Sequence, residues 1–184
     1  MSRLGIVAEG LPNTDVTIIS ELVKKILSDD LELYPRSGRD KLNVIRKFPG
    51  WLEYFRNKNV EKALVIVDQD LSCVKIIVEK MQENIRGREY RFLVKFHVIE
   101  REIETWLLSD ERAISVVVGR DVPRINETLE DIMDPKKRLK EILSRAKVTY
   151  TPETLRRIAG ESDIERIAYR CPGFRRFRQL VLDC

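Results

Sequence analysis

The chain has 184 residues, of which 43% are hydrophobic and 35% are charged. This length is typical of one domain, and the apolar share suffices for a packed core, which excludes disorder along the whole chain. The longest apolar runs, such as residues 63–67, are far shorter than the ~18 residues of a membrane-spanning helix, so we expect no membrane partner. Residues 1–6 contain neither an apolar signal region nor a cleavage site, and we expect a cytoplasmic protein.

The formal net charge of +4 comes entirely from the last third of the chain. Residues 1–119 carry 19 basic and 19 acidic side chains, whereas residues 120–184 carry 15 and 11. A basic segment interleaved with aromatic residues is typical of phosphate-backbone binding. The same pattern also fits a solvated helix face with two phenylalanines in the core. The basic residues of this segment that we name as candidate nucleic-acid contacts are Arg175, Arg176 and Arg178.

Strands and helices alternate along the first half of the chain. The pattern predicts a buried strand over 4–8, a helix over 15–27 and a short strand over 31–34. A helix over 42–56 follows, which Pro49-Gly50 must kink or split. The next expected elements are a strand over 62–67, a helix over 71–85, a strand over 91–99 and a helical segment over 100–110. Short helices complete the chain over 111–118, 136–145, 152–159, 164–169 and 174–182.

This order of elements predicts an α/β fold with a mostly parallel sheet flanked by helices and with a helical C-terminal third. We expect residues 1–119 to form the α/β core. Residues 120–184 are expected to form a basic helical extension packed on that core, within a single compact domain. In such sheets the functional site lies beyond the carboxyl ends of the strands.

Acidic residues follow three of the predicted strands. The first strand ends at Glu9, the second clear one at Asp68 and Asp70, and the third runs into Glu100, Glu102 and Glu104. Carboxylate oxygens without nitrogen or sulfur ligands suit Mg²⁺ or Mn²⁺, which would hold a phosphate-bearing substrate and activate water. The alternative is structural: a turn aspartate followed by an aspartate that caps the next helix.

Several motifs together resemble the Toprim domain of topoisomerases, primases and OLD-family nucleases. They are the strand ending in Glu9-Gly10, the Thr14-Asp15 pair that opens a helix, and the strand ending in Asp68-x-Asp70. The segment over 102–110 is similar to the Glu-x-Trp-Leu-Leu-x-Asp signature of a Toprim-like family of unknown function, related to the OLD-family nucleases. Segments 134–139 and 171–177 resemble later motifs of that family, so the resemblance spans most of the chain.

The resemblance implies a Toprim-like, Rossmann-like fold and metal-dependent cleavage of phosphodiester bonds. It also implies an ATPase partner in an anti-phage defence system. The candidate catalytic residues are Glu9, Asp68, Asp70 and Glu104. The candidate ligands of Mg²⁺ or Mn²⁺ are Glu9, Asp68, Asp70 and Asp15.

Further candidate nucleic-acid contacts lie outside the C-terminal segment. Arg39 and Lys41 stand in a polar turn, and Lys136 opens a later helix. The resemblance leads us to expect a Tyr-x-Lys motif in the later region, but Tyr150 is followed by Thr and Pro. Lys136 or Lys140 would then supply the positive charge.

A second hypothesis is that the chain is a binding module without catalytic activity, which regulates or recruits an ATPase partner. It is favoured by the missing lysine and by the position of Asp15, six residues after Glu9 instead of four. A phospho-acceptor receiver domain is disfavoured, because that fold needs an acidic pair at the end of the first strand. The sequence leaves open DNA or RNA, one metal or two, and the oligomeric state, a homo-oligomer included.

Overall fold

Four parallel strands form the centre of the molecule. The computed structural model of the chain describes residues 2–10, 14–27, 30–69 and 72–183. The sheet has the order β2-β1-β3-β4 and every neighbouring pair is parallel. The strands are β1 (Ser2–Ala8), β2 (Leu31–Ser37), β3 (Lys62–Asp68) and β4 (Leu93–Ile99). The carboxyl ends of all four therefore lie along one edge.

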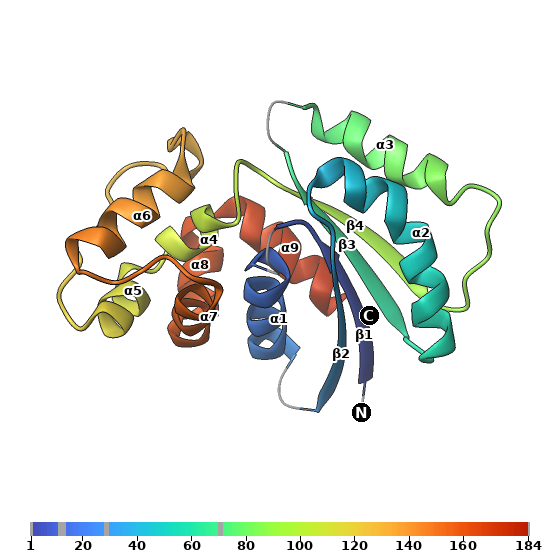
Figure 1. The fold of residues 1–184 in the computed structure, drawn as a ribbon, viewed down its shortest axis with the longest axis horizontal. Helices are drawn as coiled ribbons and strands as arrows, with labels where there is room; N and C mark the ends of the chain where they lie inside the picture. The colour runs from blue at the N-terminus through green and yellow to red at the C-terminus, as the bar shows by residue number, and fades with distance from the viewer. Residues whose placement is uncertain (1, 11–13, 28–29, 70–71, 184) are drawn as a thin grey trace.

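Helices cover both faces of the sheet, which confirms the predicted α/β fold (Figure 1). The helices α2 (Lys41–Asn57) and α3 (Val74–Asn84) pack on one face through a cluster that includes Val65 and Phe48. The other face is covered by α1 (Thr14–Leu27) and by α9 (Pro172–Leu182), which returns to the sheet from the end of the chain. The continuous apolar run of β3 is explained by burial on both faces.

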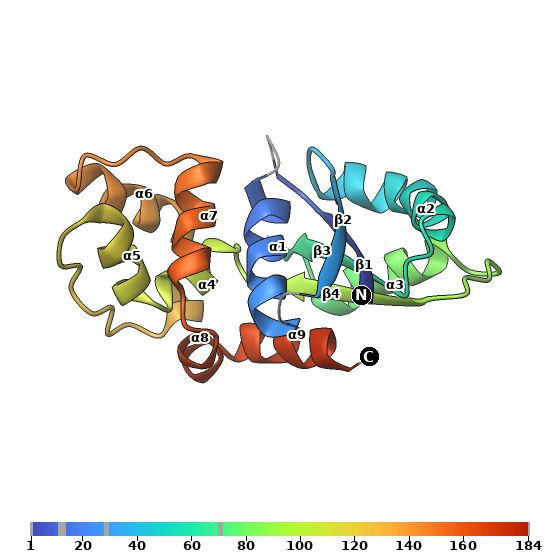
Figure 2. The same ribbon diagram turned by 90° about the horizontal axis from the view of Figure 1, so that it is seen from below.

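A group of short helices lies beyond α1, on the side away from the sheet (Figures 1 and 2). It begins at α4, before residue 120, and is joined to the sheet part through α1, which packs against α7 (Figure 2). Several of these helices start at a proline or at a side chain that caps the free N–H groups, as the sequence pattern favours. The elements of this group are α4 (Glu104–Leu108), α5 (Glu111–Val118), a 3₁₀ turn (Leu129–Asp131), α6 (Pro135–Arg145), α7 (Pro152–Glu161) and α8 (Ile164–Arg170).

Of the two outcomes expected at Pro49, a kink or a split, the structure excludes the split, because α2 is a single helix. A proline lacks the N–H that would bond to the carbonyl four residues earlier, here that of Ile45. The side-chain amide of Asn84, on α3, donates to this Ile45 carbonyl at 2.8 Å. The acceptor that Pro49 leaves free is thus satisfied by a neighbouring helix, and α2 runs as one element over its whole length.

The remaining differences are at element ends. The helical segment expected over 100–110 is confined to α4, and α3 begins at Val74, later than the pattern indicates. The 3₁₀ turn was not predicted. None of the helices in the described ranges is long and apolar enough to cross a membrane.

Gly5→Ala is expected to lower the free energy of unfolding by about 1–3 kcal/mol, because overpacking forces neighbours to shift. Gly5 lies in β1, where an added Cβ would stand 2.5 Å from two ring carbons of the buried Phe55. Gly50→Ala is the matched control, since a Cβ there meets no atom within 4 Å and alanine favours the helix. Urea unfolding of both variants checks this, and equal stability of Gly5→Ala and wild type would contradict it.

Candidate active site at the carboxyl edge of the sheet

The ends of β1 and β3 meet where the chain changes from one face of the sheet to the other. From β1 the chain leads through α1 to β2, and from β2 it crosses through α2 to β3 on the opposite side. Such a switch point is where open α/β sheets bind ligands. Here Glu9 Oε1 accepts the backbone N–H of Asp68 at 2.5 Å, so the structure brings these two candidate residues together.

Lys41 fixes the turn that follows β3. Its Nζ donates to the carbonyl oxygens of Asp68 and Gln69, each at 3.0 Å. This lysine, a candidate nucleic-acid contact, therefore holds the end of β3 against the start of α2. Asp70 lies outside the described residues.

Asp15 reaches the same edge from the first turn of α1. Gly10 makes this approach possible, since its φ of +106° is one that other residues rarely adopt. A Cβ at Gly10 would also stand 2.9 Å from Asp15 Oδ1. The absence of a side chain at Gly10 therefore allows the Asp15 carboxyl to lie close to the backbone that follows β1.

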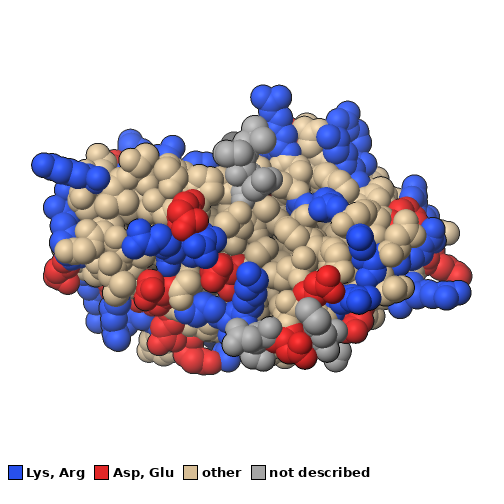
Figure 3. All heavy atoms as spheres, turned by 60° about the horizontal axis from the view of Figure 1, so that its bottom comes forward, with Lys and Arg blue, Asp and Glu red and all other residues tan. Residues whose placement is uncertain are grey.

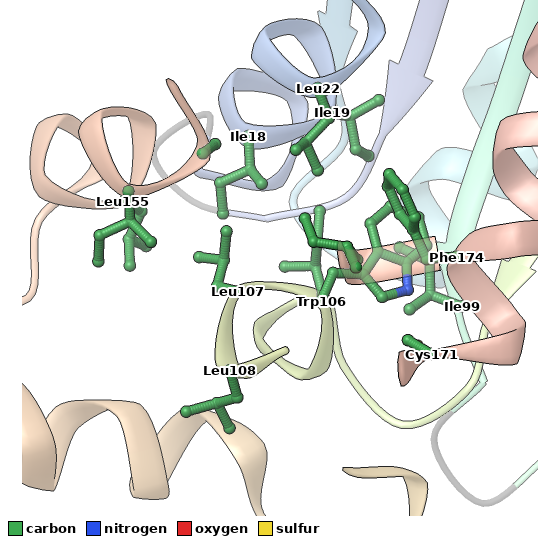
Figure 4. Packing of buried hydrophobic residues seen from close by; sticks show 14 of the residues in the cluster. Ile18, Ile19, Leu22, Ile99, Trp106, Leu107, Leu108, Leu155, Cys171 and Phe174 are labelled. Atoms are coloured by element: carbon green, nitrogen blue, oxygen red, sulfur yellow. The ribbon is translucent and has the colours of Figure 1, made fainter. Parts of the chain in front are cut away.

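Glu104 comes to the site from α4, which the core anchors tightly. Trp106, two residues further on, stacks on Phe177 with ring centroids 4.8 Å apart and meets Phe174 edge-on at 5.1 Å. Figure 4 shows Trp106 beside Phe174, and Leu107 between α1 and Leu155 of α7. Only 3% of Glu104 is exposed. The packing of α4 therefore fixes the position of a buried carboxylate.

Tyr150 closes the site from the loop between α6 and α7. Its hydroxyl donates a short hydrogen bond to Glu104 Oε1. The ammonium groups of Lys140 and Lys136 lie 5.0 and 5.9 Å from the centre of its ring. The two lysines are exposed and Tyr150 is half-buried, so the phenol separates a basic outer layer from the acidic interior.

The carboxylates act strongly on one another. Burial, together with the charges of Glu104 and Glu9, raises the pKa of Asp15 to about 8. Burial also raises the pKa of Glu102, which accepts the backbone N–H of Lys136 at 3.0 Å and so ties the start of α6 to the site. Carboxyl groups with raised pKa values in such a cluster either retain protons or bind cations.

The donors at this edge fit a hard divalent cation in type, since all are carboxylate oxygens. As the side chains stand, no group of three His, Cys, Asp or Glu within the described ranges is placed to hold one ion. Mg²⁺ commonly keeps several waters and takes only one or two protein carboxylates. Asp15 and Glu104, with Glu9 and Asp68 beside them, are the residues that would hold it.

The other candidate nucleic-acid contacts are spread over the molecule. Arg39 is exposed beside the start of α2. On α9, Arg175 donates to the carbonyl of Ala168 at 3.0 Å, whereas Arg176 and Arg178 form ion pairs with acidic partners. Figure 3 shows acidic and basic side chains interspersed over the face in view. The arginines of α9 thus serve contacts within the chain, while Lys136 lies next to the acidic cluster.

Sequence reasoning missed two contributions to the site. It treated Tyr150 only as a tyrosine without its lysine, although its hydroxyl contacts a carboxylate 46 residues away in the sequence. It also set Glu102 aside, whose carboxylate holds α6 in place. Neither contact has a local signal, because both depend on how α6 folds back over α4.

Comparison with known proteins places the chain in a family. No curated protein and no solved structure matches it. A family model described as a domain of unknown function, DUF4276, matches residues 13–181. The matched region includes Asp15, Asp68, Glu104 and Tyr150 but not Glu9. It covers most of the chain, which therefore belongs to the DUF4276 family.

Proposed function

We propose that the chain is a divalent-cation-dependent enzyme that cleaves phosphodiester bonds in nucleic acid in the cytoplasm. One observation carries this proposal. The carboxylates of Glu9, Asp15 and Glu104, from three separate parts of the chain, act on one another at the switch point of a parallel sheet, where Glu9 also accepts the backbone N–H of Asp68. The Toprim-like motifs of the sequence support the same chemistry.

A bound Mg²⁺ or Mn²⁺ would neutralise charge on the scissile phosphate and make a water molecule acidic enough to attack it. Asp15 retains a proton at neutral pH, and its carboxyl would lose that proton when it binds the cation. Glu104 offers a buried carboxylate held by α4 and by Tyr150. Glu9 keeps the ends of β1 and β3 together through its bond to Asp68.

The substrate would be held by basic side chains next to this cluster. Lys136 and Lys140 present their ammonium groups on the outer side of Tyr150, where they would contact backbone phosphates. Arg39 is exposed on the loop after β2 and would extend this contact. Binding by Arg175, Arg176 and Arg178 stays a prediction, as do the ATPase partner and the role in phage defence.

Glu104→Gln and Asp68→Ala are expected to reduce cleavage by more than about 100-fold, because loss of even an outer-shell partner costs 10–100-fold. The assay incubates the purified chain with plasmid DNA, single-stranded DNA or RNA in Mg²⁺ or Mn²⁺, with an EDTA control. Glu165→Gln, at an exposed glutamate on α8, is the matched control and should cleave as wild type does. Full cleavage by both site variants, or cleavage in EDTA, would contradict the proposal.

A binding module without catalysis is the second candidate. The bond from the Asp68 N–H to Glu9 favours it, because that bond gives Glu9 a structural task that needs no cation. In this case the wild-type chain would bind nucleic acid or an ATPase partner without cleaving in any metal. Replacing Glu104 would then leave that binding unchanged.

A further inference from the structure

We propose that Tyr150 is a positioning residue that holds Glu104 in the orientation needed to bind the cation. This inference rests on the proposed function. It assigns a task to a residue in the helical part of the molecule, outside the sheet edge that carries Glu9 and Asp68. The cation site would then be completed only when α6 and its following loop are folded against α4.

The hydrogen bond gives Glu104 a defined orientation. The Tyr150 hydroxyl donates to Oε1, so this oxygen has a fixed partner and the rotation of the carboxylate is restricted. A phenol hydroxyl can donate a hydrogen bond, and here the carboxylate oxygen of Glu104 accepts it. Residues that orient a metal ligand in this way affect metal affinity even though they do not touch the metal.

The position of Tyr150 is itself well determined. Thr151, the next residue, begins α7 by accepting the N–H of Thr154 at 3.1 Å. The ammonium groups of Lys136 and Lys140, both on α6, lie 5.9 and 5.0 Å from the centre of the ring. The ring is therefore held between α6 and α7, and its hydroxyl points inward to Glu104.

A purely structural role for Tyr150 makes a different prediction. If the ring only fills space between α6 and α4, then phenylalanine should replace it with no specific effect on the cation. If the hydroxyl orients Glu104, phenylalanine keeps the packing and the contacts with the lysines but removes the oriented carboxylate. Tyr150→Phe therefore separates the two roles.

The test measures Mn²⁺ binding to the full chain by isothermal titration and by the shift in thermal midpoint that Mn²⁺ produces. Each shift is taken relative to the same variant in EDTA, so a general loss of stability does not count. We expect Tyr150→Phe to weaken Mn²⁺ binding by about 10-fold or more. Tyr169→Phe, at an exposed tyrosine on α8, is the matched control and should bind as wild type does. Glu104→Gln should weaken binding at least as much as Tyr150→Phe.

The outcomes separate this inference from the proposed function. Wild-type affinity in Tyr150→Phe, together with weak binding by Glu104→Gln, would overturn the role of Tyr150 and leave the cation site in place. Wild-type affinity in both variants, or no Mn²⁺ binding by the wild-type chain, would overturn the cation site as well. Weak binding by Tyr150→Phe with a normal thermal midpoint in EDTA would support the inference.

Discussion

Asp15→Asn is expected to stabilise the protein by several kcal/mol at pH 8 and to change its stability little at pH 4. The carboxyl of Asp15 is placed among other acidic groups, and burial with the charges of Glu104 and Glu9 raises its pKa from 3.8 to about 8. Ionising this group in the folded protein is therefore costly. Asparagine has a similar shape but carries no charge at any pH, and so avoids that cost.

The direction of the pH dependence follows from the protons bound in each state. Between about pH 4 and pH 8 the folded protein keeps the proton of Asp15, whereas the unfolded chain has lost it. The folded state binds more protons over this range, so stability falls as the pH rises, by up to about 1.4 kcal/mol per pH unit. Above about pH 8 both states are ionised and this dependence ends.

A bound divalent cation should offset the loss of stability that the ionisation of Asp15 causes at high pH. If Mg²⁺ or Mn²⁺ binds the ionised cluster, it stabilises the wild-type chain more at pH 8 than at pH 6. At pH 8 a larger fraction of the Asp15 carboxyl has already lost the proton that the cation must displace. Asp15→Asn should lose most of that stabilisation. Thermal unfolding from pH 4 to pH 9, with cation or with EDTA, measures both effects. Asp121→Asn, at an exposed position, is the control, and an identical pH profile for Asp15→Asn and wild type would contradict the prediction.

Local patterns were sufficient for the sheet and most helices. The unbroken apolar run of β3 and the alternation of β4 both predict strands, because the burial of a strand determines which of its residues are apolar. The integrity of α2 could not be predicted in this way. The bond that compensates for Pro49 comes from Asn84, on a helix 39 residues further along the chain from Ile45.

In the candidate site, too, some contacts follow from the order of elements and others depend on tertiary packing. Glu9 and Asp68 were placed together because parallel strands align their carboxyl ends, a rule that needs only the order of elements. The contact between Tyr150 and Glu104 depends on the packing of α6 over α4, for which the sequence has no periodic signal. The basic residues of α9 have contacts that their clustering in the sequence does not indicate. Their clustering suggests a ligand surface, yet the ion pair of Arg178 with Glu165 lies within the chain.

Arg170→Ala is expected to lower the free energy of unfolding by about 3–5 kcal/mol, because it removes one of the two arginines paired with a buried carboxylate and the donor to two carbonyl oxygens. Arg170, at the end of α8, is paired with the buried Glu111 of α5. It also donates to the carbonyl oxygens of Ser109 at 2.9 Å and Ile125 at 2.5 Å. Its removal would therefore leave two carbonyl oxygens without this donor, and the Glu111 carboxylate with Arg166 as its remaining arginine partner.

The same network predicts sensitivity to acid. Burial alone would raise the pKa of Glu111, but the hydrogen bond from Arg166 and the charge of Arg170 bring it below its usual value. A carboxyl with a lowered pKa in the folded state contributes stability above its unfolded pKa of about 4.5 and loses it as the pH falls further. Arg170→Ala should therefore show a weaker loss of stability below pH 4.5 than wild type does.

Arg156→Ala is the matched control for this network. Arg156 also pairs with a glutamate, at 2.8 Å, but both side chains are largely exposed, and surface pairs contribute about 0–1 kcal/mol. Urea unfolding of the two variants compares a buried pair with an exposed one on neighbouring helices. A similar, small cost for both would contradict the prediction and would mean that Arg166 and water compensate for the lost partner of Glu111. A large cost for Arg170→Ala alone would show that the helical part, which supplies Glu104 and Tyr150, is fixed by this ion pair.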